Sequence, residues 1–384
     1  MMSHDRSPVM IRKPLGVMCI LLLGGILTAG LWPFHSPRNQ VSWLAGGKGL
    51  QFGRHGTILS STAFHVAPER GNAPCSIEIW VEPTPSATSG TVLAFYAREA
   101  PRQFSIYQYY TGLVFQSEFQ GKQQGGRTRG FYVHGIFRQG KQAFITITSD
   151  GEQTSVYVDG ILAKHALSFP LSGQDLVGQL VIADSPRTSD SWSGVLRGLA
   201  LFSQDVTPAQ VLHHYETWTK DGRPDIGKDD GAVALYLLAE REGKLVHNQI
   251  PSGIDLYIPD RFVVVGQYFL EPFWKEYKPS WSYYRDVLVN IAGFVPLGFM
   301  FCAYLSLAGR FKRPALVTIL LGFAVSLTIE VTQAYLPTRD SGMTDVITNT
   351  SGTGLGIWLY RLVSRHGLLA KSWAYTPGRL RTRV

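Results

Sequence analysis

Polar and ionisable side chains recur at helical spacing inside the apolar segments of the C-terminal third of the chain. They form three sets: Asp286 and Asn290; Ser326, Glu330 and Gln333; and Asp345 and Asn349. Residues three or four apart lie on one face of a helix, so each set marks a single face. A carboxylate inside a membrane is costly unless it is paired or reaches water. The pattern therefore predicts one polar cluster shared by three helices, with carboxylates suited to hydrogen bonding or acid–base chemistry.

Two interpretations of this cluster are open. In the first, the side chains hold the helices together: Arg339 neutralises an acid from the connecting loop, and the amide groups bond helix backbones. In the second, the cluster lines a polar cavity that receives a lipid headgroup or another polar ligand. Ionisable residues within membrane spans are functional by default, which favours the second interpretation, and the two are compatible.

Four segments have the character of membrane spans: residues 15–34, 287–308, 315–336 and 343–363. Each approaches the roughly 20 residues that a bilayer core requires. The alternative for the first is a cleaved signal peptide, but its apolar run is long for one and no clear A-x-A site follows. We predict that it is retained. The fourth segment is rich in Gly, Ser and Thr and is the weakest of the four.

The positive charge of the chain lies beside these spans. Three flanking stretches, at the N-terminus, at residues 309–313 and in the tail from residue 361, hold twelve bases and one acid, Asp5. The rest of the chain has 24 bases and 27 acids, a net charge of −3. The sequence therefore excludes nucleic acid as a partner. By the positive-inside rule, both termini are cytoplasmic, residues 35–285 are extracytoplasmic, and the polar cluster lies in the outer third of the bilayer.

The extracytoplasmic segment has the pattern of an all-β domain. Residues 76–81, 91–96, 104–107 and 143–147 are strand-like, and Asp150-Gly151 and Asp159-Gly160 are turn signals. One amphipathic helix is expected over residues 207–217, with Thr207 as its N-cap and Pro208 at its first position. Many short strands separated by turns predict a jelly-roll β-sandwich of two sheets.

Two stretches of this segment carry a family resemblance. Ser149-Asp150-Gly151 followed by residues 155–160 (SVYVDG), and residues 191–202 (SWSGVLRGLALF) followed by Val206-Thr207-Pro208, resemble laminin-G-like, concanavalin A-like sandwiches. The resemblance covers residues 41–265. Residues 232–236 with His247-Asn248 resemble a part that usually opens such domains but stands last here. This order predicts a permuted domain whose two ends meet near the membrane.

The polar cluster carries a second resemblance. The spacing from Asp286 and Asn290 through Gly293 to Gly298, then from Ser326 to Gln333, then from Arg339 to Gly352, is similar to the VanZ-like membrane family. That family is named for a protein linked to teicoplanin resistance. The resemblance implies a location and a broad process, such as cell-envelope function or glycopeptide-antibiotic response, rather than a reaction. This chain differs from minimal members of the VanZ-like family in having a large β-domain inserted after its first span.

The expected domains follow from these assignments. They are a cytoplasmic N-terminus (1–14), a first span (15–34), the sandwich (40–266), an aromatic interfacial connector (267–285), a VanZ-like domain with three spans (286–363) and a basic cytoplasmic tail (364–384). The aromatic residues of the connector suit the headgroup layer of a membrane. The whole is a multidomain protein, a β-sandwich joined to a four-helix membrane bundle.

Other candidate sites are weaker. Asp184 and Asp190, with nearby turn oxygens, are candidates for a calcium site in the sandwich, although Asp and Ser also populate turns for local reasons. His213 and His214 are expected to be a surface pair. Glu78 lacks the second carboxylate that a glycosidase needs. No other cofactor is expected.

We favour a non-enzymatic envelope protein in which the sandwich binds a glycan or a protein and the bundle recognises a membrane lipid or a lipid-linked precursor. Two alternatives stay open. One is an enzyme acting on a lipid-linked or polysaccharide substrate through Asp286, Glu330 and Asp345. The other is a structural scaffold.

Overall fold

The structure is a computed structural model and describes residues 7–66, 72–85, 88–100, 102–119, 127–138, 140–188, 190–227, 229–277 and 279–365. The chain divides into two compact units, one of residues 36–267 and one of residues 1–35 together with 268–384. The predicted cytoplasmic N-terminus up to residue 6 and the predicted basic tail beyond residue 365 lie outside the described residues.

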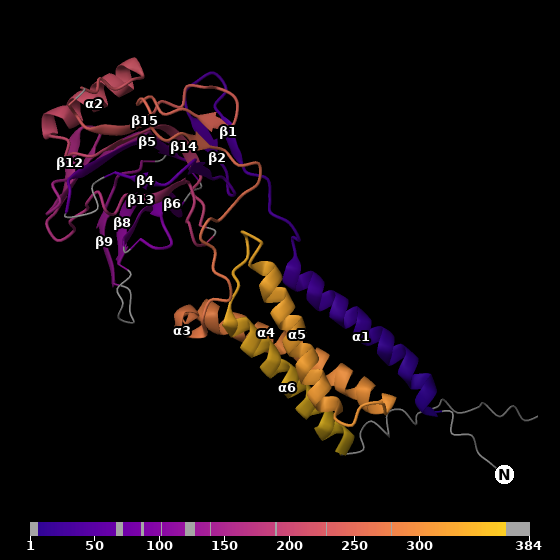
Figure 1. Ribbon diagram of the computed structural model, residues 1–384. Helices are drawn as coiled ribbons and strands as arrows, with labels where there is room; N and C mark the ends of the chain where they lie inside the picture. The colour runs from indigo at the N-terminus through magenta and orange to yellow at the C-terminus, as the bar shows by residue number, and fades with distance from the viewer. Residues whose placement is uncertain are drawn as a thin grey trace, which may run out of the picture. The chain divides into compact units, whose positions relative to one another are not determined.

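Residues 36–267 form a sandwich of two antiparallel sheets, which confirms the predicted fold class (Figure 1). One sheet has the order β1 (Val41–Trp43), β2 (Leu50–Phe52), β14 (Gly194–Phe202), β5 (Cys75–Pro83), β10 (Ala143–Ser149), β11 (Thr154–Val158), β12 (Ile161–Ala166), and β15 (Ala232–Tyr236) pairs with β14. The other has the order β16 (Leu245–Val246), β17 (Leu256–Tyr257), β3 (Ile58–Ser60), β13 (Val177–Ile182), β6 (Ser89–Tyr96), β7 (Arg102–Tyr109), β8 (Gly112–Phe119), β9 (Arg127–Val133), and β4 (Phe64–His65) pairs with β13.

Alternating side chains build the core between the two sheets. Ile77 and Ile79 of β5 stand opposite Ile147 and Ile145 of β10, and all four are buried. Successive strand residues point to opposite faces, so these isoleucines share the face that lies in the core between the sheets. Glu78 and Thr146, which alternate with them, are buried as well, on the opposite face. The four predicted strands lie within β5, β6, β7 and β10. The turn between β11 and β12 also matches its signal: Asp159 and Gly160 have φ of 50° and 79°, as a type I′ hairpin requires.

The two ends of the sandwich meet, as the permuted order predicts. Asn39 N donates to Asp260 O at 3.1 Å, and Phe262 N donates to Pro37 O at 3.0 Å. The late strand β15 pairs with β14 and completes its sheet. The expected location of these ends near a membrane stays a prediction.

The predicted amphipathic helix is α2 (Pro208–Asp221), four residues longer than expected at its C-terminal end. Thr207 caps it, with its side chain accepting from Gln210 N and the Gln210 side chain accepting from Thr207 N. This reciprocal capping box satisfies two backbone donors that a helix start leaves unpaired. The helix ends at Gly222, whose φ of 69° is favourable for glycine.

The second unit is helical. Its helices are α1 (Ser7–Leu31), α3 (Phe273–Glu276), α4 (Trp281–Ala308), α5 (Pro314–Gln333) and α6 (Met343–Arg365). Three of the described helices are long and apolar enough to cross a membrane: residues 12–31 of α1, α4 and α5. The fourth predicted span is a helix, α6, but it is not among these three, so its crossing stays a prediction.

Residues 267–285, the predicted aromatic connector, contain α3 and the first residues of α4. Their location in the headgroup layer stays a prediction. The early start of α4 has a local cause, since the Ser280 side chain accepts a hydrogen bond from Tyr283 N and caps the helix.

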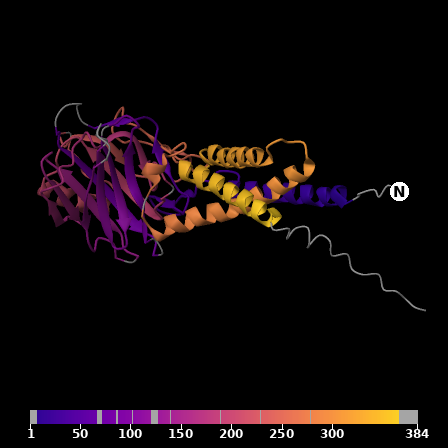
Figure 2. The same cartoon turned by 90° about the horizontal axis from the view of Figure 1, so that it is seen from below.

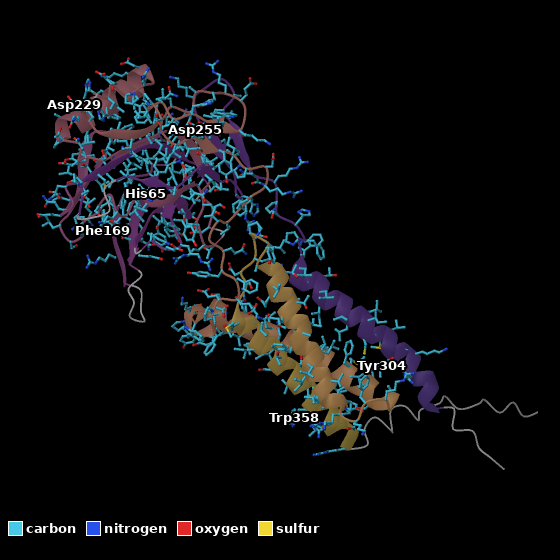
Figure 3. The ribbon with its side chains drawn as sticks, viewed as in Figure 1. His65, Phe169, Asp229, Asp255, Tyr304 and Trp358 are labelled. Atoms are coloured by element: carbon cyan, nitrogen blue, oxygen red, sulfur yellow. The ribbon has the colours of Figure 1, made fainter. Side chains whose placement is uncertain are left out.

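Helices α4, α5 and α1 pack together within the bundle (Figures 1 and 2). Their apolar contact includes Phe294 and Leu297 of α4 and Val325 and Ile329 of α5. The Tyr304 ring of α4 lies against Gly16 of α1, where an added Cβ would be 3.2 Å from the ring (Figure 3). Large apolar side chains such as Leu288, Leu320 and Trp358 are exposed, as in helices that face lipid.

Candidate functional site

Close approach of α4 and α6 positions the polar cluster. A Cβ at Gly352 would lie 2.2 Å from Ile291 O, and one at Gly356 would lie 2.1 Å from Val295 O. Only glycine fits at such distances, so these two residues bring the backbones into contact. Small residues four apart on a membrane helix let backbones approach closely, and here this lets short polar side chains reach between helices.

Three hydrogen bonds join α4, α5 and α6 at this contact. Asn290 Nδ2 of α4 donates to Asp345 Oδ1 of α6 at 2.8 Å. Asn349 Nδ2, one turn further along α6, donates to Ser326 Oγ of α5 at 2.9 Å. Ser326 Oγ in turn donates to the Asp345 backbone oxygen at 3.4 Å. The structure thus brings together one predicted polar residue from α4, one from α5 and two from α6.

Glu330 lies beside the start of α6. Its side chain is 1% exposed, and Oε2 accepts a hydrogen bond from Gly342 N at 2.9 Å. Its backbone oxygen accepts from Ser341 Oγ at 2.8 Å. A carboxylate suits this position because backbone N–H groups at a helix start lack intrahelical acceptors and carry partial positive charge. Glu330 therefore holds the loop before α6 in place.

Gln333 and Arg339 connect the cluster to α1. Gln333 Nε2 donates to Gly30 O at 2.7 Å. Arg339 donates to Trp32 O from Nε at 3.1 Å and from Nη2 at 2.6 Å. These two hydrogen bonds go to a carbonyl just past the C-terminal end of α1, where a cation is favourable for the helix dipole. The role of Arg339 as counter-charge to an acid stays a prediction.

Asp286 is exposed, whereas the sequence predicts that it is buried in the cluster. Its side chain is 61% exposed, and Oδ1 lies 3.3 Å from Arg285 Nη2. It sits in the second turn of α4, a turn before Asn290 reaches α6. Asp286 does stand four residues before Asn290, but at this end of α4 no other described helix covers its side chain. The expectation that Asp286 is buried with the other carboxylates is therefore wrong.

Glu276 is a participant that sequence reasoning missed. Its Oε2 accepts from Thr344 N at 2.8 Å and from Thr344 Oγ1. The preceding chain also pairs with the loop before α6: Glu271 N donates to Ser341 O, and Met343 N donates to Glu271 O, both at 2.9 Å. Glu276 carries no periodic signal, because it comes from the short helix α3 rather than from a span. Its only sequence hint is an acid among aromatic residues next to a span.

The cluster keeps unused hydrogen-bonding capacity. Asn349 is 5% exposed, and its Oδ1 has no hydrogen-bond partner among the described residues. Asp345 is half-buried, and three further acids, Glu276, Asp286 and Asp340, lie close enough to act on its charge. The arrangement is therefore rich in acceptors and in negative charge.

A second buried acidic cluster lies in the sandwich, beneath α2. His214 Nδ1 is 3.1 Å from Glu78 Oε1, and His214 Nε2 is 3.6 Å from Asp230 Oδ2. Glu78 and His214 are 0% and 1% exposed. Burial raises the pKa of Glu78, and the two carboxylates raise the pKa of His214 against the opposing effect of burial.

This cluster corrects two sequence expectations. His214 is not a surface residue, because α2 turns it onto the sheet, where its ring also stacks on Phe202 at 5.7 Å. Glu78 does have a second carboxylate nearby, Asp230, but the imidazole lies between them. Only His213 is exposed as expected, next to Asp225. The contact joins residues 136 apart in sequence, so no local pattern could reveal it.

The candidate calcium residues also lie together. Asp184 Oδ1 accepts from Asp190 N and from Ser191 Oγ, both at 3.0 Å, while its buried Oδ2 has no partner among the described residues. Burial raises the pKa of Asp184 to about 8. The described residues contain no group of three or more His, Cys, Asp or Glu arranged to hold a metal ion. Calcium binding here stays a prediction.

Comparison with known families supports both resemblances. Residues 239–364 match the VanZ/LLP1 family, and residues 59–212 match the concanavalin A-like lectin/glucanases superfamily. Protein VanZ of Enterococcus faecium is 34% identical over 83 residues, which are 22% of this chain and 48% of that protein. The chain thus spans about half the length of this relative.

Several solved structures are similar to the sandwich. Domain 4 of the arabinanase AbnA from Geobacillus stearothermophilus, in complex with arabinotriose, has a TM-score of 0.35 at 16% identity over 46% of this chain and 85% of that one. The sialidase module CBM40 of Ruminococcus gnavus, bound to sialyllactose, has a TM-score of 0.32 at 12% identity over 43% and 95%. The chain therefore combines a VanZ-like helical region with a concanavalin A-like sandwich.

Proposed function

We propose that this chain is a cell-envelope membrane protein whose bundle binds the polar headgroup of a membrane-associated ligand and whose sandwich binds a glycan or an envelope protein. The observation that carries the proposal is the incomplete polar cluster. Asn349 Oδ1 is buried without a described partner, beside the half-buried Asp345. A buried acceptor without a donor costs about 1–3 kcal/mol, a cost that a bound donor removes.

The described contacts favour binding over acid–base catalysis. Of the three carboxylates considered for a reaction, Glu330 is buried and bonded to Gly342 N, and Asp286 is exposed beside Arg285. An acid–base pair must instead flank one reacting bond. Asp345 is the member of this set that keeps both partial exposure and a place inside the cluster.

Binding is tested by mass spectrometry of the full chain purified in mild detergent. The wild-type protein is expected to retain a lipid or lipid-linked molecule at about one per chain. Asp345→Asn keeps an oxygen for Asn290 but removes the charge, so retention should fall while folding is unchanged. Equal retention by the wild-type protein and the variant would count against a headgroup site at this cluster.

The proposed topology places both termini in the cytoplasm and the sandwich outside. The three cysteines are buried, so an added surface cysteine is a selective label. Asp229→Cys, at an exposed site of the sandwich, should react in intact cells with a membrane-impermeant maleimide (Figure 3). Lys312→Cys, between α4 and α5, should react only after lysis. The reverse pattern would contradict the topology.

The sandwich offers an aromatic surface for a glycan. The rings of Tyr109 and Tyr110 are 4.8 Å apart, and those of Tyr109 and Tyr132 are 6.3 Å apart. Tyr109 and Tyr110 are exposed at the turn between β7 and β8. Aromatic faces with a hydroxyl edge combine apolar contact with hydrogen bonding, as sugar rings require. Binding of the full chain to a glycan array, lost in Tyr110→Ala, would support this part, and a uniformly blank array would count against it.

A further inference from the structure

Unsatisfied acceptor capacity in the bundle cluster defines the chemistry of its ligand. Asn349 uses its amide donor on Ser326 Oγ at 2.9 Å, which leaves Oδ1 as a buried acceptor. A ligand that completes this site must therefore supply an N–H or O–H donor. A ligand group that only accepts hydrogen bonds would leave the oxygen unsatisfied.

The charge around this oxygen narrows the choice further. Asp345 lies one turn before Asn349 on α6, and one of its oxygens accepts from Asn290. Glu276, Asp286 and Asp340 add negative charge around Asp345. An anionic group would be repelled here, whereas a cationic donor would be attracted by every carboxylate of the set.

We propose that the bundle cluster binds a primary ammonium group between Asp345 and Asn349, the group that phosphatidylethanolamine carries in its headgroup. The inference rests on the proposed headgroup site and specifies its ligand class. Residues four apart share one face of a helix, with Cβ atoms about 5–6 Å apart, so side chains of Asp345 and Asn349 can both reach one small group. An ammonium would bind each oxygen at an N–O distance of about 2.7–2.9 Å.

The number of donors gives this proposal a sharp signature. A primary ammonium has three N–H donors, and each added methyl group removes one donor while the charge stays constant. Two acceptors need at least two donors. The binding affinity should therefore change little with one methyl group and fall most steeply between one and two.

The test is lipid retention by the full-length wild-type chain, measured by native mass spectrometry with phosphatidylethanolamine and its mono-, di- and trimethylated forms. Retention is expected to fall by about tenfold from the first to the last, with the largest step between mono- and dimethyl lipid. This series needs no variant, so a failure to fold cannot obscure it. Equal retention of all four lipids would overturn the ammonium assignment and leave a headgroup site standing. If the protein retained none of these four lipids and no other lipid either, the proposed function would be overturned as well.

A variant locates the site. Asp345→Asn is expected to bring the retention of phosphatidylethanolamine to the level of the trimethylated lipid. The matched control is Asp260→Asn, the same change at an exposed carboxylate of the sandwich, which should leave retention unchanged. If both variants keep the preference, the ammonium binds elsewhere and the proposal is wrong. Displacement by glycerophosphoethanolamine would show that the headgroup alone suffices, whereas retention in its presence would show that the site requires the membrane lipid.

Discussion

The two units each bury a group of carboxylates, and they treat them differently. In the sandwich, Glu78 and Asp230 flank His214, and the central pair is sealed beneath α2. In the bundle, Glu330 and Glu276 accept from the backbone at the start of α6, while Asp345 stays half-buried next to the unpartnered Asn349 Oδ1. The first cluster contains its own counter-charge and is fully buried, although Glu78 Oε2 lacks a described partner. In the second, the unpartnered oxygen of Asn349 is also buried, but Asp345, one turn earlier on α6, is partly exposed. An unpartnered buried oxygen therefore does not by itself mark a binding site, and the partial exposure of Asp345 is what separates the two clusters.

Removing the imidazole from the sandwich cluster should give the largest effect. His214→Ala leaves Glu78 buried without its partner, and breaking such a buried pair costs about 3–5 kcal/mol. The neighbouring His213→Ala is the matched control, because His213 is exposed and its removal should cost less than about 0.5 kcal/mol. Unfolding followed by tryptophan fluorescence suits the measurement, since Trp192 and Trp218 are buried in the sandwich. If both variants lost the same amount of unfolding free energy, His214 would not be the essential partner of a sealed Glu78, and the contrast with the bundle cluster would fail.

The pH dependence of sandwich stability should show the cost of its buried acids. Asp184 has a pKa of about 8 in the folded state against 3.8 when exposed, so it binds its proton more tightly when folded. The raised pKa values of Glu78 and His214 act in the same direction. The contribution of Asp184 to stability is therefore greatest at low pH and falls as the pH rises from about 4 towards 8, by at most about 1.4 kcal/mol per pH unit.

Asp184→Asn should flatten this profile and stabilise the sandwich by roughly 2 kcal/mol at pH 8, because the amide cannot ionise. Its oxygen still accepts from Asp190 N and Ser191 Oγ. The check is the unfolding midpoint of both proteins from pH 5 to 8 in calcium-free buffer. An unchanged slope in the variant would show that Asp184 is not the titrating group. A rise of the wild-type midpoint with added calcium, absent in the variant, would support the calcium prediction.

In the bundle, Glu330 should behave as a structural residue. Glu330→Ala leaves Gly342 N buried without an acceptor and should cost about 1–3 kcal/mol. Glu330→Gln keeps an oxygen at that position and should cost clearly less. Thermal unfolding of the full chain in detergent measures both. If the Gln variant lost as much stability as the Ala variant, the negative charge rather than the hydrogen bond would be the essential feature.

Asp345→Asn should have the smallest effect on stability. The variant keeps an acceptor for Asn290 and reduces repulsion from the surrounding acids, so its stability should stay within about 0.5 kcal/mol of wild type. The same unfolding assay measures it, with Glu330→Ala as the reference for a structural loss. A destabilisation as large as that of Glu330→Ala would make Asp345 part of the helix packing and weaken the case for a site.

The parts of the molecule that sequence predicted are those with local signals. Alternation placed the strands, and Thr207 and Pro208 marked the start of α2. Helical periodicity also selected Asn290, Asp345 and Asn349, whose hydrogen bonds join α4, α5 and α6.

The misses have a common cause. Glu276 and His214 reach their partners through chain folding rather than through spacing, across 68 and 136 residues. Asp286 has the correct spacing, but it lies near the N-terminal end of α4, where its side chain is exposed rather than covered by other helices. Periodicity predicts which face of a helix a residue occupies, but it does not predict whether other helices bury that face at a given position.

We expect a donor from outside the protein to complete the bundle cluster, where Asp345 is partly exposed. We expect none to reach the sandwich cluster, where Glu78 Oε2 also lacks a described partner but Glu78 and His214 are fully buried. A density map of the full chain in nanodiscs containing phosphatidylethanolamine tests this contrast most directly. We expect non-protein density within hydrogen-bond distance of both Asp345 and Asn349 Oδ1, and none beside Glu78. A map in which protein side chains alone satisfy Asn349 and Asp345 would contradict it.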